Sequence, residues 1–173
     1  MRPTAYLDIE TTGLDPWRHQ ILEVAIIHAP DDAVVHFSLP IDLTRADPRA
    51  LEVNKYHQRL PELRQIQVTS PDAVRLMQEA LGDRNIVGNN VQFDCRFIEH
   101  FFRQYGPSEI NATPWRYHIV DLKALVAGRY RLGPAPWKTD DVVRCTGVDL
   151  PSNYHSALAD AYWNKAVYEE VTA

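Results

Sequence analysis

The order of the predicted elements is the feature that most constrains the fold of this chain. Three strands come first, joined by turn residues, and two further strands then alternate with helices. The expected strands cover residues 6–10, 20–28, 33–39, 85–88 and 117–120. The expected helices cover 48–56, 70–82, 91–105, a segment from 121, 139–145 and 154–171. A run of hairpins followed by such alternation predicts an α/β fold with a mixed sheet covered by helices.

Length and composition predict one domain over residues 1–173. A chain of 173 residues with 45% hydrophobic residues can bury one sizeable core, and it is short for two. We see no signal-like leader and no apolar run that could span a bilayer, so we expect a soluble, intracellular, cytoplasmic protein without a membrane partner. Cys95 and Cys145 form no C-x-x-C pair, which argues against a disulfide framework or a cysteine zinc site.

The net charge of −5 argues against a protein that wraps long stretches of nucleic acid. It does not exclude a short nucleic-acid end that enters a site, because metal ions held by several acids would reverse the local field. The charge is therefore weak evidence against a nuclease.

Asp8 and Glu10 form an acidic pair on the first predicted strand. Because side chains alternate across a strand, both carboxylates project to one face while Leu7 and Ile9 anchor the other. Like charges this close raise each other's pKa unless a cation lies between them. A hard divalent ion such as Mg²⁺ would resolve the conflict. The alternative is the polar face of an exposed edge strand.

Asp94 is an acid on the apolar side of a predicted helix. Phe97, Ile98 and Phe101 follow it by three, four and seven residues, so Asp94 lies on the stripe that should face the core. The predicted strand before this helix ends at a Gly-Asn-Asn turn, which would bring Asp94 to the end of the sheet, where ligands of α/β folds gather. A favourable position near the positive end of the helix dipole is the alternative explanation.

The last predicted helix repeats this pattern, because Asp160 shares a face with Trp163 and Val167. His155 lies five residues before Asp160, about 140° away on a regular helix, so it cannot belong to the same stripe. It can reach the same place only from the entering loop or a frayed first turn. An ordinary exposed histidine is the alternative.

Three segments together resemble the motifs of the DnaQ-like 3′ to 5′ exonucleases, the family that includes polymerase proofreading subunits, RNase T and oligoribonuclease. The matching segments are 8–13 (Asp-Ile-Glu-Thr-Thr-Gly), 87–94 (Val-Gly-Asn-Asn-Val-Gln-Phe-Asp) and 155–161 (His-Ser-Ala-Leu-Ala-Asp-Ala). The third segment resembles the histidine variety, DEDDh, because Ser156 stands where the tyrosine variety has Tyr. Asn89 departs from the pattern, since many relatives have His there. The implied fold is a ribonuclease H-like mixed five-stranded sheet flanked by helices.

The resemblance implies a two-metal mechanism with Mg²⁺ or Mn²⁺. Asp8 would bridge two ions, Glu10 and Asp160 would complete one site, and Asp94 would act through water or at the second site. His155 would be the general base that activates water, and the product would be a nucleoside 5′-monophosphate. The catalytic residues are therefore expected to be Asp8, Glu10, Asp94, His155 and Asp160.

The resemblance also implies a grip on a nucleic acid 3′ end. Thr11 would hold the terminal nucleotide and Leu14 would wedge against its base, although Leu14 could be a plain turn residue. Tyr56 or His57 could stack on a base, although Tyr56 could equally belong to the core. Trp17 and Trp137 lie in loops and could contact substrate or be structural. The expected substrate-binding residues are Ile9, Thr11, Thr12, Gly13, Leu14, Asn90, Tyr56 and His57.

Substrate and partner remain open at this stage. Single-stranded DNA or DNA 3′ ends are favoured, with a 3′ to 5′ exoribonuclease or oligoribonuclease as the alternative. A non-catalytic subunit that binds nucleic-acid ends on the same fold is the rival outside the enzymes, and an endonuclease is a third reading. The expected partner besides nucleic acid is a polymerase or a second copy of the chain.

Overall fold

The fold is built on a mixed five-stranded sheet. The computed structural model describes residues 3–173. Its strands are β1 (Thr4–Thr11), β2 (Ile21–Ala29), β3 (Val34–Ser38), β4 (Asn85–Gly88) and β5 (Ile119–Asp121). They lie in the order β3-β2-β1-β4-β5; the first three pair antiparallel, and β1, β4 and β5 are parallel. The predicted α/β fold with a mixed sheet is confirmed.

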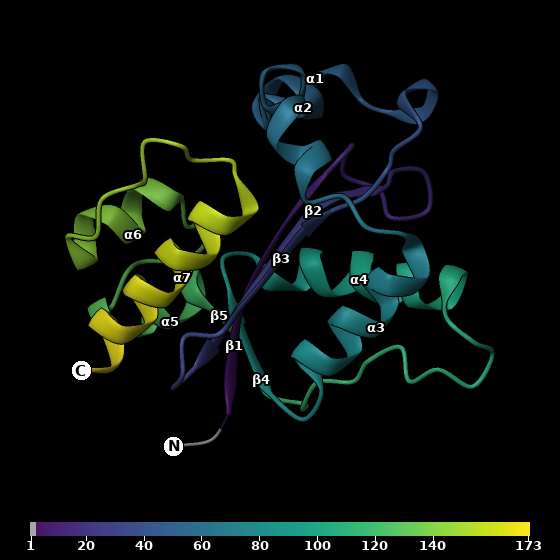
Figure 1. The fold of residues 1–173 in the computed structure, drawn as a ribbon. Coiled ribbons are helices and arrows are strands. Elements are labelled where there is room, and N and C mark those ends of the chain that lie inside the picture. Colours follow the sequence, from purple (N-terminus) through teal and green to yellow (C-terminus); the bar gives the residue numbers. More distant parts are fainter. Residues whose placement is uncertain (1–2) are drawn as a thin grey trace.

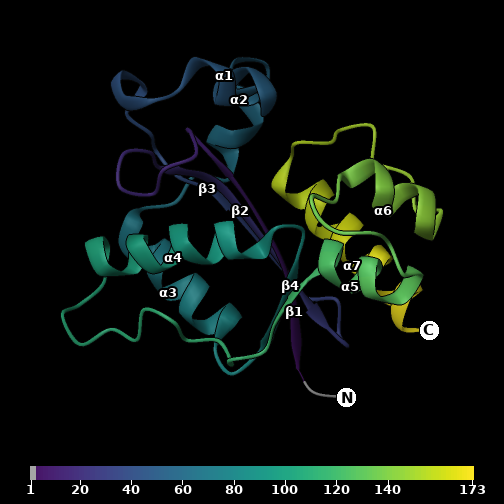
Figure 2. The same cartoon turned by 180° about the vertical axis from the view of Figure 1, so that it is seen from behind.

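Helices cover both faces of this sheet. They are α1 (Pro48–Val53), α2 (Tyr56–Gln65), α3 (Ser70–Leu81), α4 (Val91–Tyr105), α5 (Leu122–Tyr130), α6 (Thr139–Thr146) and α7 (Ala157–Thr172), with a short 3-10 helix at Leu43–Arg45. Helices α3 and α4 lie on one face, α5, α6 and α7 lie on the other, and α1 and α2 lie beyond one end (Figures 1 and 2). Within residues 3–173, no helix is long and apolar enough to cross a membrane.

The residues of β1 alternate between the two faces. Leu7 and Ile9 are buried in a cluster with residues of α3 and α4, whereas Tyr6 is buried in a second cluster with residues of α5, α6 and α7. Because side chains alternate along a strand, Asp8 and Glu10 lie on the same face of β1 as Tyr6. They therefore project towards the α7 side of the sheet. The expected separation of the acidic pair from its apolar neighbours is confirmed.

The helix predicted over 48–56 ends early, at Val53, and a further helix that was not predicted follows it. Asp47 caps α1 as its sequence suggests, but α1 has only six residues. Lys55 then takes a left-handed backbone conformation with φ 52°, and α2 begins at Tyr56. Helix α2 escapes prediction because Pro61, a residue type that usually breaks helices, lies inside it.

The last helix begins later than the predicted residue 154. His155 has a left-handed backbone conformation with φ 68°, and Ser156 is extended, so α7 starts at Ala157. The prediction of a helical residue 155 is therefore wrong. His155 lies instead on the segment that leads into α7. From this position, as the sequence analysis required, it can reach Asp160.

A buried carboxylate on β2 joins the elements around the end of the sheet. Glu23 is paired with Glu10 in the β1–β2 register and is completely buried. Its oxygens accept hydrogen bonds from Arg59 (2.7 Å to each), from His36 Nε2 (2.8 Å) and from the N–H of Ala157 (3.2 Å). Burial alone would raise the pKa of Glu23, but the hydrogen bonds from His36 and Arg59 and the Arg59 charge outweigh it and lower the pKa.

Arg59 connects this carboxylate to the chain before α7. Its Nη1 donates to the carbonyls of His155 (3.2 Å) and Asn54 (3.4 Å), and its Nη2 also donates to Ser156 Oγ (3.1 Å). One guanidinium thus links α2 from one end of the sheet to β2 and to the segment that carries His155. The planar, multiply donating guanidinium suits this task better than a lysine ammonium would.

We predict that Arg59→Ala strongly destabilises the protein, because it leaves the Glu23 carboxylate buried without its cation. Breaking a buried ion pair from one side typically costs about 3–5 kcal/mol. Urea unfolding at neutral pH measures the loss. The control is Arg75→Ala, which removes the exposed Arg75–Glu79 pair (3.4 Å) and should change the free energy of unfolding by no more than about 1 kcal/mol. Equal losses in the two variants would contradict the prediction.

Candidate active site

A cavity of about 270 Å³ lies at the carboxyl ends of β1 and β4. Ligand sites of α/β sheets usually occupy this place, outside the carboxyl ends of the strands. Its lining includes all five residues that the sequence predicts as acids or base, namely Asp8, Glu10, Asp94, His155 and Asp160. The structure therefore brings together residues from β1, from α4 and from the start of α7.

Side chains satisfy the backbone of β1 where β4 no longer pairs with it. The parallel pairing with β4 covers only the first three residues of β1. Beyond it, the carbonyl of Leu7 accepts from Asn164 Nδ2 (3.0 Å), and the N–H of Ile9 donates to Asp94 Oδ1 (3.0 Å). Unpaired buried backbone groups are costly, so these two bonds hold α7 and α4 against the acidic end of β1. They also explain why an acid at position 94 is only 4% exposed.

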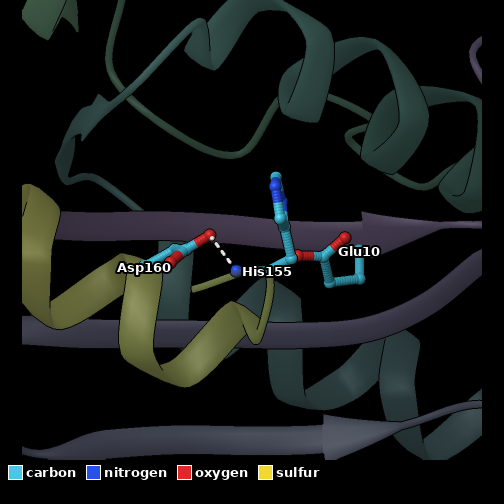
Figure 3. A group of neighbouring side chains, drawn as sticks. All are labelled: Glu10, His155 and Asp160. Carbon is cyan, nitrogen blue, oxygen red and sulfur yellow. Dashed lines mark hydrogen bonds between the residues drawn. The ribbon is translucent and has the colours of Figure 1, made fainter. Parts of the chain in front are cut away.

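Glu10, His155 and Asp160 form the closest group of ligand-type side chains in this cavity. One oxygen or ring-nitrogen atom of each lies within 4.8 Å of the others. Figure 3 shows the group, with Asp160 Oδ2 accepting from the backbone N–H of His155 (3.2 Å). The other oxygen, Asp160 Oδ1, is buried without a hydrogen-bond partner among the described residues. A buried carboxylate oxygen without a donor suits a cation.

The acids of the cavity carry more negative charge than the chain compensates. Burial raises the pKa of Glu10 to about 8, and the charges of Asp160 and Glu23 add to the effect. Burial raises the pKa of Asp160 to about 7. Burial, followed by the charges of Asp94 and Asp160, raises the pKa of Asp8 well above its ordinary range, and burial does the same for Asp94. A divalent cation among these groups would favour their ionised forms.

The imidazole of His155 is shifted in the opposite direction. Burial lowers the pKa of His155, and the positive charge of Lys55 lowers it further. The neutral ring is therefore the dominant form at neutral pH, as a general base requires.

The cavity is also lined by residues that the sequence does not predict as functional: Asn89, Phe93, Lys123, Thr139, Tyr154, Trp163 and Asn164. Asn164 follows Asp160 by four residues, so helical periodicity would have placed both on one face. Lys123 and Thr139 come from α5 and α6, and no local pattern marks them. Asn89 has a buried Oδ1 without a partner among the described residues, at the position that departs from the family pattern.

The turn after β1 is held rigidly and presents one apolar side chain. Thr11 Oγ1 donates to the carbonyl of Gly13 (2.7 Å), and Thr12 Oγ1 accepts from the N–H of Gln20 (2.9 Å). The ring of His19 packs against Gly13, because this residue has no side chain. A Cβ at position 13 would lie only 2.4 Å from that ring. Leu14 is 80% exposed beside this fixed turn.

The remaining predicted substrate contacts divide between cavity, surface and core. Ile9 and Asn90 line the cavity. His57 is exposed, but Tyr56 is only 8% exposed and is packed in a cluster with Leu22. A buried ring cannot stack on a base, so the structure assigns Tyr56 to the core, which was the alternative explanation.

Solved structures that resemble this chain include exonucleases I. One exonuclease I aligns with a TM-score of 0.76 at 18% identity, covering 99% of this chain and 41% of that one. Exonuclease I of E. coli in complex with a dT13 oligonucleotide aligns with a TM-score of 0.70 at 21% identity, again over 99% and 41%. The enzyme from Methylocaldum szegediense gives 0.70 at 19% identity, over 99% and 40%. At such identities the likeness concerns the fold.

Sequence comparison gives curated relatives and a family. A DNA polymerase III of PolC type from Thermotoga petrophila is 27% identical over 158 residues, which are 90% of this chain and 11% of that protein. Its counterpart from Thermotoga maritima is 26% identical over the same extent. The chain thus spans about a tenth of the length of these relatives. The sequence model of the family described as Exonuclease, RNase T, matches residues 6–168, so the chain belongs to that exonuclease family.

Proposed function

We propose that this chain is a metal-dependent 3′ to 5′ exonuclease that hydrolyses the terminal phosphodiester of a nucleic acid to release a nucleoside 5′-monophosphate. The observation that carries the proposal is that four carboxylates and His155 line one cavity, next to a fixed turn with an exposed Leu14. The family match supports hydrolysis of nucleic acid. The proposed catalytic unit is the single domain formed by residues 1–173.

The four carboxylates fit a divalent metal, Mg²⁺ or Mn²⁺. Asp8, Glu10, Asp94 and Asp160 would hold two ions, and the unpartnered Oδ1 of Asp160 together with the raised pKa values of these acids fits that use. When bound, such a pair would stabilise the attacking and leaving oxygens of an in-line phosphoryl displacement. The E. coli exonuclease I solved with zinc and single-stranded DNA is a structural relative that holds a metal.

His155 is proposed to take the proton from the attacking water. Its ring is neutral at neutral pH because burial and Lys55 lower its pKa. Its backbone is fixed on both sides, since its N–H donates to Asp160 (3.2 Å) and its carbonyl accepts from Arg59 (3.2 Å). A fixed base within reach of a metal site is the arrangement that this proton transfer needs.

The turn over residues 11–14 is proposed to hold the 3′-terminal nucleotide. Leu14 would pack against the terminal base, while the backbone of Thr11, Thr12 and Gly13 would face the sugar. Ile9 and Asn90 would line the place of the terminal phosphate. His57 is exposed on α2 and would contact a more distant nucleotide.

DNA is the proposed substrate, because relatives of both kinds are enzymes of DNA: exonuclease I was solved with DNA oligonucleotides, and the curated relatives are DNA polymerases. The polymerase relatives also support a polymerase as partner, with a second copy of the chain as the other candidate. Rates on matched single-stranded DNA, mismatched duplex DNA and short RNA decide between the DNA enzyme and the exoribonuclease. A protein that only binds ends would degrade none of them.

We predict that Asp8→Ala reduces Mg²⁺-dependent release of nucleotide from a 3′-labelled oligonucleotide by more than about 100-fold. Loss of a group in the metal's outer shell already costs about 10- to 100-fold, and Asp8 is proposed as a direct ligand. The control is Glu62→Gln, which removes an exposed charge from α2 outside the cavity. Unchanged release by Asp8→Ala would refute the site, and cleavage of circular single strands would favour an endonuclease instead.

Replacement of His155 by Ala is expected to slow turnover by about 100- to 10,000-fold, the usual contribution of a general base. Because its ring also lies near Glu10 and Asp160, metal affinity must be measured beside the rate. Mn²⁺ titration by calorimetry should give nearly the same affinity in the variant. A large loss of Mn²⁺ affinity would instead make His155 a metal ligand.

Metal binding should strengthen as the pH rises from about 6 to about 8. The raised pKa values of Asp160 (about 7) and Glu10 (about 8) mean that bound metal must displace protons in this range. Without metal, the folded state holds more protons than the unfolded state between the ordinary and the raised pKa values, so its stability falls as the pH rises through that window.

Thermal unfolding with and without Mg²⁺ at several pH values measures both effects. We expect the metal-free melting temperature to fall towards pH 8 and the stabilisation by Mg²⁺ to grow. A stabilisation by Mg²⁺ that is independent of pH would contradict the assignment of these carboxyls.

A further inference from the structure

We infer that Trp17, Arg96 and Arg103 form a surface that holds a single strand of nucleic acid upstream of the 3′ end. We call it the Trp17 surface. The inference rests on the proposed function, because it extends the same substrate beyond the catalytic cavity. It concerns a part of the molecule that contributes nothing to the proposed metal site.

Trp17 is held in place yet leaves most of its side chain in solvent. It is 73% exposed, although an indole gains more than most side chains from burial. The backbone N–H of Trp17 donates to Asp15 Oδ1 (2.9 Å), and its backbone carbonyl accepts from Arg45 Nη2 (3.4 Å). Its ring meets His100 of α4 edge to face, with centroids 4.5 Å apart at 65°. An indole fixed at its edge and open to solvent can receive a flat ligand such as a base.

Two arginines of α4 lie beside this ring. Arg96 and Arg103 are exposed and line, with Pro16 and Trp17, a depression of about 150 Å³. The Arg103 side chain pairs with Glu99 (2.7 Å), whereas the Arg96 side chain has no hydrogen bond or ion pair among residues 3–173. An exposed arginine next to an exposed indole suits a ligand that carries both a phosphate and an aromatic base.

The Trp17 surface continues the catalytic cavity along α4. Phe93 lines that cavity, and Arg96 lies one helical turn beyond it. The exposed Leu14 lies in the same loop between β1 and β2 as Trp17. From Phe93 to Arg103 the helix advances by about 15 Å.

If the bases stay stacked as in one strand of duplex DNA, at about 3.4 Å per nucleotide, this distance corresponds to about four nucleotides. A strand whose 3′ end lies at Leu14 can therefore place a base on Trp17 and phosphates on the arginines. Stacking on an aromatic ring and contacts with phosphate do not depend on the base sequence. The surface can therefore hold any single strand while nucleotides are released from its 3′ end.

Substrate length provides the test. Hydrolysis of a dinucleotide and of a 12-nucleotide single-stranded DNA is compared for the wild type and Trp17→Ala. We expect Trp17→Ala to raise KM for the 12-mer by about 5- to 100-fold, the loss of one stacked base, and to change hydrolysis of the dinucleotide by less than about twofold. Trp17→Phe should restore most of the affinity. Arg96→Ala should reduce the salt dependence of 12-mer binding by about one phosphate contact.

Matched controls lie far from the surface. Tyr117→Ala removes an aromatic side chain that is 80% exposed before β5, at the other end of the parallel strands, and Arg129→Ala removes an exposed arginine of α5. Neither should alter the dependence on length or on salt. Circular dichroism and melting temperatures confirm that each variant is folded.

The two possible failures are distinguishable. If the wild type hydrolyses the dinucleotide and Trp17→Ala leaves KM for the 12-mer unchanged, the inference is overturned while the proposed function stands. If the wild type hydrolyses neither substrate with Mg²⁺ or Mn²⁺, the proposed function fails and the inference fails with it.

Discussion

The organisation of the site depends on how the backbone of β1 is satisfied beyond its pairing with β4. A strand that extends beyond its neighbour has unpaired N–H and C=O groups, which must find other hydrogen-bond partners. Asp94 and Asn164 supply them, through Ile9 N–H and the Leu7 carbonyl. These bonds fix α4 and α7 on either side of the strand end, and the gap between them is the cavity. Asp94 is therefore a structural residue and a proposed metal ligand at once.

A buried acid and a half-buried acid lie opposite each other on β2 and β1, and the charges around them differ. Glu23 is completely buried, but Arg59, His36 and a backbone N–H surround its oxygens, and its pKa falls. Across the same strand pair, burial raises the pKa of Glu10 to about 8. Arg59 contacts the Glu23 carboxylate directly, whereas its charge lowers the pKa of Glu10 by less than burial and the neighbouring acids raise it. We therefore expect an external cation beside Glu10, because a charge that is removed from water without a compensating partner destabilises the folded state.

Most strands and helices and the acids of the cavity could be predicted from the sequence, because they follow local patterns. Asp8 and Glu10 follow strand alternation and Asp94 follows helical periodicity, and both patterns are local. The partners of Glu23 lie on other elements, so nothing near it in sequence distinguishes it from an ordinary strand residue. Helix α2 escapes because of Pro61, and the left-handed backbone of His155 depends on contacts with Arg59 and Asp160. Apart from α2, where Pro61 is misleading, the features that were not predicted depend on contacts between residues that lie on different elements.

The central claim is that the acids at the end of β1 hold two metal ions. Anomalous scattering from a crystal soaked with Mn²⁺ and a nucleoside 5′-monophosphate tests it most directly. We expect two manganese peaks in this cavity, in contact with the carboxylates of Asp8, Glu10, Asp94 and Asp160. A cavity without manganese, or manganese bound only elsewhere on the protein, would contradict it.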